Sequence, residues 1–211
     1  MATRRVKDKL AHAPLPFRRR RDERMAMPNV QRRWTAADLA RLPYDGQRYE
    51  VIDGALYVTP APSLRHQEAA FVLAMSLREY LDRERVGHVF MAPADVQFSP
   101  TTVVQPDVLV MPLVDARRPE HFAEVRRLLV AIEVLSPGTA RADRVAKRVV
   151  YREGPVDQYW LVDLDARTLE RSLRSELRPE VLPERLAWHP AGAATPFILD
   201  VPAYFARVLD R

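Results

Sequence analysis

The chain has 211 residues, of which 47% are hydrophobic and 29% are charged, so it is long enough for one domain with a buried core. It contains no cysteine. That excludes disulfides, zinc–thiolate sites and cysteine nucleophiles, and it favours a reducing compartment, so we expect a cytoplasmic protein. No apolar run approaches the roughly 20 residues that span a bilayer, so we expect no membrane partner.

The positive charge of the chain is concentrated at its N-terminus. Residues 1–33 hold 11 Lys and Arg against 3 Asp and Glu, whereas residues 34–211 hold 22 against 25. The first segment also has few apolar residues and no periodicity, which predicts a disordered basic tail followed by one folded domain over 34–211. The tail is interpreted either as an electrostatic arm for nucleic acid or as a solvated leader, and a charge run alone favours the second.

The first half of the folded domain alternates helix and strand signals. Residues 35–38 are typical of a capped helix start. Residues 48–52 and 55–58 flank an Asp-Gly pair, a pattern that predicts a β-hairpin. Ser63 can cap a long helix that runs to about residue 86, because apolar residues recur there three or four positions apart.

The second half is richer in strand signals. Strands are expected within 87–98, 103–111, 128–135, 158–163 and 169–177, and helices over 119–127, up to about 151 and near 203–209. The run 128–135 is nearly all apolar, which is typical of a central strand buried on both faces. On the helix before residue 151, four apolar side chains are expected to face inward: Ala142, Val145, Ala146 and Val149. This order indicates an α/β or α+β domain with a mixed β-sheet flanked by helices.

Two acids occupy positions where a carboxylate is costly. Asp107 lies within the apolar run 103–110, and Glu133 interrupts the run 128–135. A buried carboxylate must be paired or bound to a cation, and two of them on neighbouring strands can hold one Mg²⁺ or Mn²⁺ together with waters and a backbone carbonyl. Such an ion lowers the pKa of a bound water and stabilises charge on a phosphate. Lys147, on the following helix, can orient that water or neutralise that charge.

Each of these residues also has a simpler interpretation. Asp107 alone could be a strand-end acid held by backbone amides, and Glu133 alone could pair with an arginine. Lys147 alone could lie on a solvated helix face beside Asp143. The order of Pro-Asp, acid-bearing strand and helical lysine is harder to explain in those terms.

The pattern resembles the PD-(D/E)XK nuclease superfamily, with Pro106-Asp107 and Glu133-Val134-Leu135 as its two elements. Leu135 stands where that motif has lysine, and Lys147 is similar to lysines that lie on the following helix in several branches. More closely, the chain resembles a bacterial family of restriction-endonuclease-like proteins from about residue 34 to its end. The matching segments are Trp34–Leu39, Arg48–Gly54, Arg65–Gln67, Gln105–Asp107, Glu133–Pro137, Asp143 with Lys147 and Tyr151, and Tyr159–Asp163.

The resemblance implies a restriction-endonuclease-like fold and a metal-dependent endonuclease that hydrolyses phosphodiester bonds, with DNA as the expected partner. The residues that it implies for the site are two metal ligands (Asp107 and Glu133), the Val134 carbonyl as a third ligand, the catalytic lysine Lys147, an accessory acid (Glu50) and a polar lining residue (His66). From the residues alone, a solvent-facing histidine at a helix start is an equally good interpretation of His66. Dimers are common in this fold, so a homodimer is compatible with it.

Recognition of nucleic acid is indicated less clearly than catalysis. Arg141, Arg144 and Arg148 follow i+3 and i+4 spacing on the Lys147 helix and are interpreted as a phosphate-facing row. Acids outnumber basic residues over 34–211, however, whereas nucleic-acid-binding proteins usually have a basic face. The alternative is therefore a non-catalytic nucleic-acid-binding or regulatory module that keeps the nuclease fold. The sequence has no nucleophile elbow, phosphate loop or dinucleotide glycine motif that would indicate another enzyme class.

Overall fold

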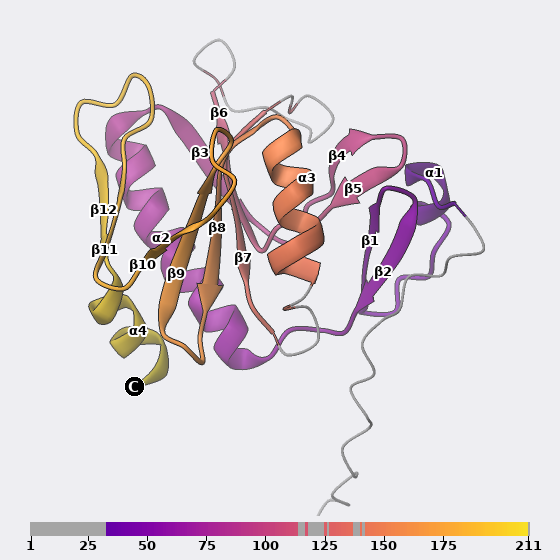
Figure 1. Cartoon of the computed structure of the whole chain (residues 1–211), viewed down its shortest axis with the longest axis horizontal. Helices are drawn as coiled ribbons and strands as arrows, with labels where there is room; N and C mark the ends of the chain where they lie inside the picture. The colour runs from indigo at the N-terminus through magenta and orange to yellow at the C-terminus, as the bar shows by residue number, and fades with distance from the viewer. Residues whose placement is uncertain are drawn as a thin grey trace, which may run out of the picture.

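The computed structural model describes residues 33–113, 117, 125, 127–136, 140 and 142–210 (Figure 1). The predicted basic tail and nearly all of the predicted helix over 119–127 lie outside these residues. The described residues form a six-stranded sheet, a four-stranded sheet and a two-stranded hairpin. The predicted α+β architecture, with a mixed sheet flanked by helices, is confirmed.

The six-stranded sheet is the centre of the fold. Its order is β10 (Glu180–Leu182), β9 (Thr168–Leu173), β8 (Val156–Asp163), β7 (Leu128–Val134), β6 (Val108–Pro112) and β3 (Gly87–Met91). β7 and β8 run parallel, and the other neighbouring pairs are antiparallel. All seven residues of β7 are buried, as the apolar run in the sequence predicts.

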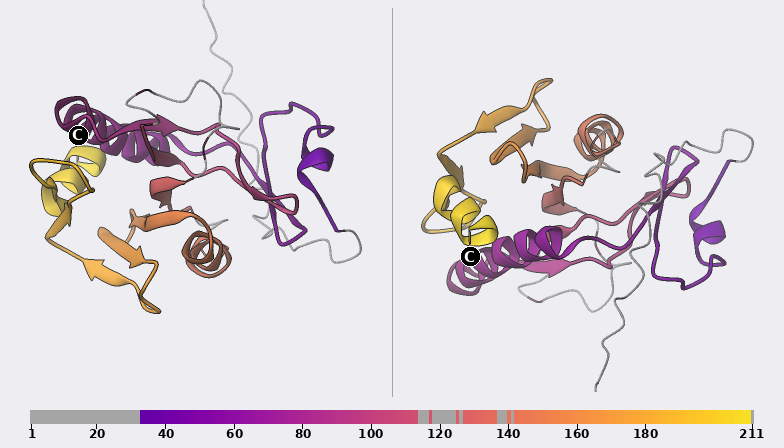
Figure 2. Two further views of the ribbon diagram at one scale, coloured as in Figure 1. Left: turned by 90° about the horizontal axis from the view of Figure 1, so that it is seen from above. Right: turned by 90° about the horizontal axis from the view of Figure 1, so that it is seen from below.

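Side chains of β7 alternate between two cores, one on each face of the sheet. Val130 and Ile132 pack into the first core, and Ala131 packs into the second. The first core is covered by α2 (Leu64–Glu84), α4 (Val201–Leu209) and the hairpin of β11 (Arg185–Trp188) and β12 (Phe197–Asp200). The second is covered by α3 (Arg148–Glu153) and the four-stranded sheet. Figure 2 shows α2 and α4 on the opposite side of the sheet from α3.

Helix α2 forms as the sequence predicts. The Ser63 hydroxyl accepts the His66 backbone N–H at 3.2 Å, and Arg85, with φ of 56°, ends the helix. The predicted apolar stripe is buried; its members are Ala70, Leu73, Ala74, Leu77 and Leu81. Neither α2 nor any other described helix is long and apolar enough to cross a membrane.

The four-stranded sheet lies at one end of the molecule (Figure 1). Its order is β2 (Ala55–Thr59), β1 (Arg48–Ile52), β5 (Thr102–Val104) and β4 (Val96–Ser99). The predicted hairpin joins β1 to β2, and both turn residues, Asp53 and Gly54, have positive φ, as tight hairpin turns require. Before it, α1 (Ala36–Leu39) begins with a capping box between Thr35 and Asp38.

Several strands differ from the predicted ones. Two predicted strand regions are each divided by a turn, near 92–95 and near 105–107, and the strand predicted over 169–177 ends at 173. The three strands β10, β11 and β12 were not predicted. They have only three or four residues each, so they offer too few positions for an alternating pattern to be recognised.

The first core depends on an aromatic cluster around β8. Trp160 is fully buried, stacks on Phe197 with ring centroids 6.2 Å apart, and meets Trp188 edge-on at 5.8 Å. We expect Trp160→Ala to lower the free energy of unfolding by about 3–5 kcal/mol, because it opens a large cavity between the sheet and the β11–β12 hairpin. Urea denaturation followed by circular dichroism measures this. Leu177→Ala is the control, because the Leu177 side chain is 83% exposed. This substitution should change the free energy of unfolding by less than about 0.5 kcal/mol.

Candidate active site

Asp107 and Glu133 face each other across two neighbouring strands. In the antiparallel pair β6–β7, Val108 lies opposite Ile132, so one step along the register places Asp107 opposite Glu133. The backbone N–H of Val134 donates to Asp107 Oδ2 at 2.8 Å, which fixes the carboxylate against the end of β7. The structure thus brings together the two acids that the sequence singled out.

The carboxylate of Asp107 is held by two further donors from different elements. Arg48 Nη1, on β1, donates to Oδ1 at 2.7 Å, and His66 Nε2, in the first turn of α2, lies 3.0 Å from Oδ2. Burial alone would raise the pKa of Asp107, but the hydrogen bond from His66 and the charges of His66 and Arg48 outweigh it and hold that pKa well below its usual range. Asp107 is therefore stabilised as an anion.

Lys147 lies at the centre of a second group of acids. Its ammonium is 2.8 Å from Glu50 Oε2, 2.9 Å from Glu133 Oε1 and 3.5 Å from Asp143 Oδ1, and its side chain is only 4% exposed. Burial lowers the pKa of Lys147, but the three carboxylates more than compensate, so the net shift is well upward and the ammonium stays charged. The simpler interpretation of Lys147 as a solvated surface lysine is wrong.

Glu133 has a different electrostatic environment from Asp107. It accepts hydrogen bonds from Lys147 and from the Tyr151 hydroxyl, at 2.9 and 2.8 Å. Complete burial nevertheless raises its pKa well above the usual value, and the nearby charges of Asp107, Asp143 and Glu50 add to the shift. The pKa values of two adjacent carboxylates in one site are thus shifted in opposite directions: that of Asp107 is lowered and that of Glu133 is raised.

The helical segment that carries Lys147 presents a polar face to the sheet. It consists of η2, a π-helix over Ala142–Lys147, followed by α3. Asp143, Lys147 and Tyr151 point inward and are buried, whereas Val145 and Val149 are 61% and 38% exposed. The predicted inward position of these two valines is wrong, because Asp143, Lys147 and Tyr151 occupy the inward face. The Ala146 side chain packs partly buried against the second core, as predicted, and the Ala142 side chain lies outside the described residues.

Glu50 is a buried member of the site, although an acid on a hairpin strand is usually exposed. Its Oε1 accepts the Gln105 backbone N–H at 2.7 Å, and only 2% of the residue is accessible. Sequence reasoning gave no role to Arg48. A signal was present, because alternation along a strand places Arg48 on the same face of β1 as Glu50, the acid that the resemblance implied for the site.

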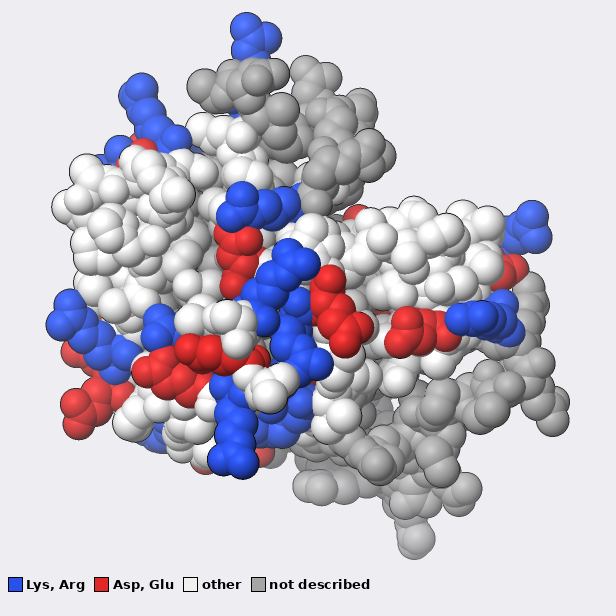
Figure 3. Space-filling model, turned by 45° about the horizontal axis from the view of Figure 1, so that its top comes forward, with Lys and Arg blue, Asp and Glu red and all other residues white. Residues whose placement is uncertain are grey.

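The predicted arginine row does not lie free beside the site. Arg144 bonds to Asp163 and Glu170, and Arg148 bonds to Glu170. Arg141 lies outside the described residues. On the face drawn in Figure 3, basic and acidic side chains alternate rather than forming one basic surface. These ion pairs hold the η2–α3 segment against β8 and β9, and they reduce the charge that the two arginines could offer to a phosphate.

One end of the site opens into a hollow of 680 Å³, and Arg48, His66 and Asp107 are on its wall. Asp107 itself is only 3% exposed, so a group in the hollow would meet Arg48 and His66 first. His66 is thus buried beside Asp107 on the wall of the hollow, and its interpretation as a solvent-facing histidine is wrong.

The donor set fits a hard divalent cation. The site holds four carboxylates (Glu50, Asp107, Glu133 and Asp143) but only two permanent cations (Arg48 and Lys147). Burial raises the pKa of Glu133 and this excess of negative charge adds to the shift. Oxygen ligands are the ones that Mg²⁺ and Mn²⁺ prefer. Within the described parts of the chain, no three His, Asp or Glu side chains are grouped to hold a metal. A bound ion would thus rely on two carboxylates, the backbone and water.

A mixed sheet with paired acids on adjacent strands and a buried lysine on the next helix defines the restriction-endonuclease-like class of nuclease folds. The chain belongs to the Uma2 family, described as "Putative restriction endonuclease", whose family model matches residues 36–192. A crystal structure of "a putative nuclease belonging to DUF820" from Anabaena variabilis superimposes with a TM-score of 0.68 at 19% identity, covering 83% of this chain and 99% of that one. No match is found among curated proteins.

The opposite pKa shifts of the two facing acids predict opposite effects on stability. Asp107→Asn should lower the free energy of unfolding at pH 7 by about 2–4 kcal/mol, because it leaves Arg48 and His66 without their anion. Glu133→Gln should leave it unchanged or raise it, because the amide removes a buried charge. Denaturation in urea measures both variants.

The pH dependence checks the cause of these effects. Asp107 has a lowered pKa in the folded state, so its contribution to stability is complete above its pKa in the unfolded chain, near 3.8. That contribution is lost as the pH falls toward the lower pKa of the folded state. Glu133 has a raised pKa in the folded state, so it lowers the free energy of unfolding as the pH rises above its pKa in the unfolded chain, near 4.5. The free energy of unfolding of both variants should therefore approach that of the wild type at acidic pH. Equal destabilisation by the two variants at pH 7 would contradict this electrostatic account.

Proposed function

We propose that the protein is a metal-dependent endonuclease that hydrolyses phosphodiester bonds, with DNA as its substrate. The observation that carries this proposal is the placement of Asp107 opposite Glu133, with the ammonium of Lys147 buried against Glu133. Neither a surface salt bridge nor a strand-end cap explains why four acids and a lysine are buried together.

In this proposal Asp107, Glu133 and the Val134 carbonyl hold one Mg²⁺ or Mn²⁺. When bound, the ion supplies a more acidic water and stabilises negative charge on the phosphate. Glu50 and Asp143 hold the Lys147 ammonium in place, at 2.8 and 3.5 Å. From that position Lys147 can donate a hydrogen bond to a water or to a phosphate oxygen next to Glu133.

Arg48 and His66 have a separate role in the same proposal. Both donate to Asp107 and both line the open hollow, so they lie between the buried carboxylates and an approaching substrate. A guanidinium is well suited to bind a phosphate through paired N–H groups. We assign Arg48 and His66 to binding the phosphate from the hollow side.

A second candidate function is a non-catalytic module that keeps the nuclease fold. The observation that favours it is that both oxygens of Asp107 already accept hydrogen bonds within the chain. In this alternative the ion pairs of the site serve stability alone.

A cleavage assay that compares the wild type with Glu133→Gln distinguishes the nuclease from the non-catalytic module. The substitution is suitable because it is expected to preserve the fold. Wild-type protein should cut plasmid or single-stranded DNA with Mg²⁺ or Mn²⁺ and should stop when EDTA is added. Glu133→Gln should cut at least about 100-fold more slowly, as expected when one charge-stabilising group is lost. Asp157→Asn is the control: its side chain is 38% exposed and paired with Arg127 on the surface, and it should retain full activity.

Calorimetric titration with Mn²⁺ completes the test. The wild type should bind the ion, and Glu133→Gln should bind it more weakly, whether or not a substrate has been found. If the wild type neither cuts nucleic acid nor binds Mn²⁺, the non-catalytic module is the correct function.

A further inference from the structure

A larger groove adjoins the hollow at Asp107. It has a volume of 1260 Å³ and runs along the four-stranded sheet, between α1 with its following loop and the loop near residue 93. Four residues line both spaces, so the groove and the hollow lie next to each other there: Arg48, Pro62, Gln67 and Ala92. A substrate held with its phosphate at Arg48 would therefore extend into the groove.

The lining of this groove is suited to bases rather than to phosphates. Its polar groups are mainly amides and its flat surfaces are aromatic; these side chains are Gln47, Gln67, Gln97, Gln105, Tyr44, Tyr49 and Phe98. Amides hydrogen-bond the edges of nucleobases, and aromatic rings stack on their faces. A groove that followed a phosphate backbone would instead be lined with basic side chains.

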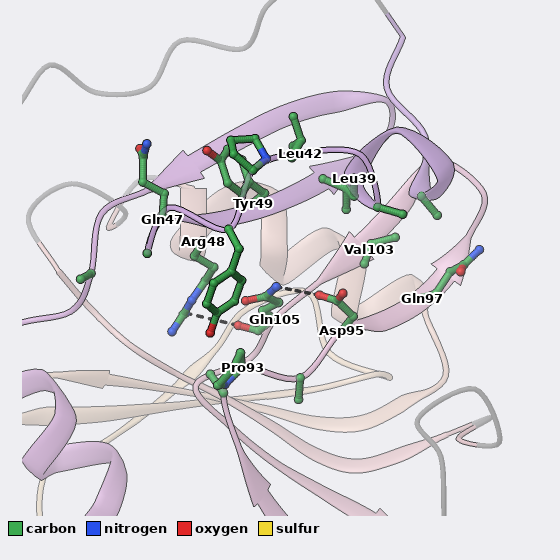
Figure 4. A pocket seen from close by; sticks show the side chains of 18 of the residues that line it. Leu39, Leu42, Gln47, Arg48, Tyr49, Pro93, Asp95, Gln97, Val103 and Gln105 are labelled. Carbon is green, nitrogen blue, oxygen red and sulfur yellow. Dashed lines mark hydrogen bonds between the residues drawn. The ribbon is translucent and has the colours of Figure 1, made fainter.

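The charged residues of the groove are already engaged. Arg48 donates to Asp107 and to the Gln105 carbonyl, and Gln105 Nε2 donates to Asp95 at 2.6 Å. Figure 4 shows this chain of contacts from Arg48 through Gln105 to Asp95 along the groove. The Gln105 backbone N–H also holds Glu50, so the groove wall and the acid cluster share one residue.

We propose that this groove binds unpaired nucleotides adjacent to the phosphodiester at Asp107, so that the substrate class is single-stranded or locally unpaired nucleic acid. The inference rests on the proposed nuclease function. In a duplex the Watson–Crick edges are paired and the base faces are stacked on one another, so the tyrosines of the groove could not stack on them. The groove also exceeds the about 300–1,000 Å³ of a site for one small ligand, which leaves room for more than one base.

The ion pairs of the surface support the same substrate class. Duplex binding relies on many phosphate contacts from a basic face. Several arginines of the described residues are instead paired with acids, among them Arg127 with Asp157 and Arg171 with Glu180. Recognition by stacking and amide contacts needs fewer free charges.

Binding without metal tests the groove independently of catalysis. The full chain is titrated, in EDTA and about 0.2 M salt, into fluorescently labelled oligo(dT) of about 20 nucleotides and into a duplex of equal length, and anisotropy is measured. The single strand should bind at least about tenfold more tightly than the duplex. Tyr44→Ala and Tyr49→Ala should each weaken single-strand binding by about 5- to 100-fold, the effect of losing one stacked base.

Two controls separate stacking from general damage. Tyr49→Phe keeps the ring and loses only the hydroxyl that donates to Asp45, so it should bind within about twofold of wild type. Leu177→Ala removes an exposed apolar side chain outside the groove and should change nothing. Tyr44 is fully exposed, so its truncation cannot unfold the domain.

The outcomes distinguish this inference from the proposed function. Equal or tighter duplex binding, no binding of either oligonucleotide, or tyrosine variants that bind like wild type would each overturn the groove assignment. Tyrosine-dependent binding by a protein that never cuts would leave the groove assigned and remove the nuclease. Cleavage that depends on Glu133 but not on the tyrosines would support the nuclease and overturn the groove assignment.

Discussion

The buried ammonium of Lys147 is the interaction on which the site depends. It joins Glu50 on the four-stranded sheet to Glu133 on the six-stranded sheet, and it is carried by a third element, η2. Removing a charge from water costs several kcal/mol unless partners replace the solvent, so the buried ammonium of Lys147 depends on the carboxylates around it. The distance between the two sheets is thus fixed by charge as well as by apolar packing.

The remaining negative charge distinguishes this cluster from a structural salt bridge. Structural ion pairs generally balance, whereas here four acids are buried with two permanent cations. Burial raises the pKa of Glu133, and the charges of the other three acids add to the shift. Asp107 is stabilised as an anion by Arg48 and His66, at the end of the cluster that opens to the hollow. In the proposed function, a divalent cation that entered the cluster would offset this unbalanced negative charge.

Much of this arrangement could be predicted because local and global signals agree. The hairpin, the long helix and the central strand each have a clear period or turn, and Asp107, Glu133 and Lys147 each break an otherwise apolar or lysine-free region. Prediction failed where a polar face is the buried one. The η2–α3 segment turns its charged side inward because its neighbours are acids, and only the tertiary contact shows this. Arg48 was missed for the same reason, since its partner is 59 residues away in sequence.

The charge of the chain is distributed so that different parts could attract a nucleic acid and recognise it. Residues 1–33 hold 11 of the 33 basic residues. On the described surface, arginines such as Arg144 and Arg148 are paired with acids, and the groove beside Asp107 is lined by amides and tyrosines. Long-range attraction to a polyanion depends on net charge, and selection among nucleic acids depends on which groups can enter a shaped space. In the proposed function the first would come from the N-terminal segment and the second from the groove. The buried acids would then act only on a strand that the groove had already accepted.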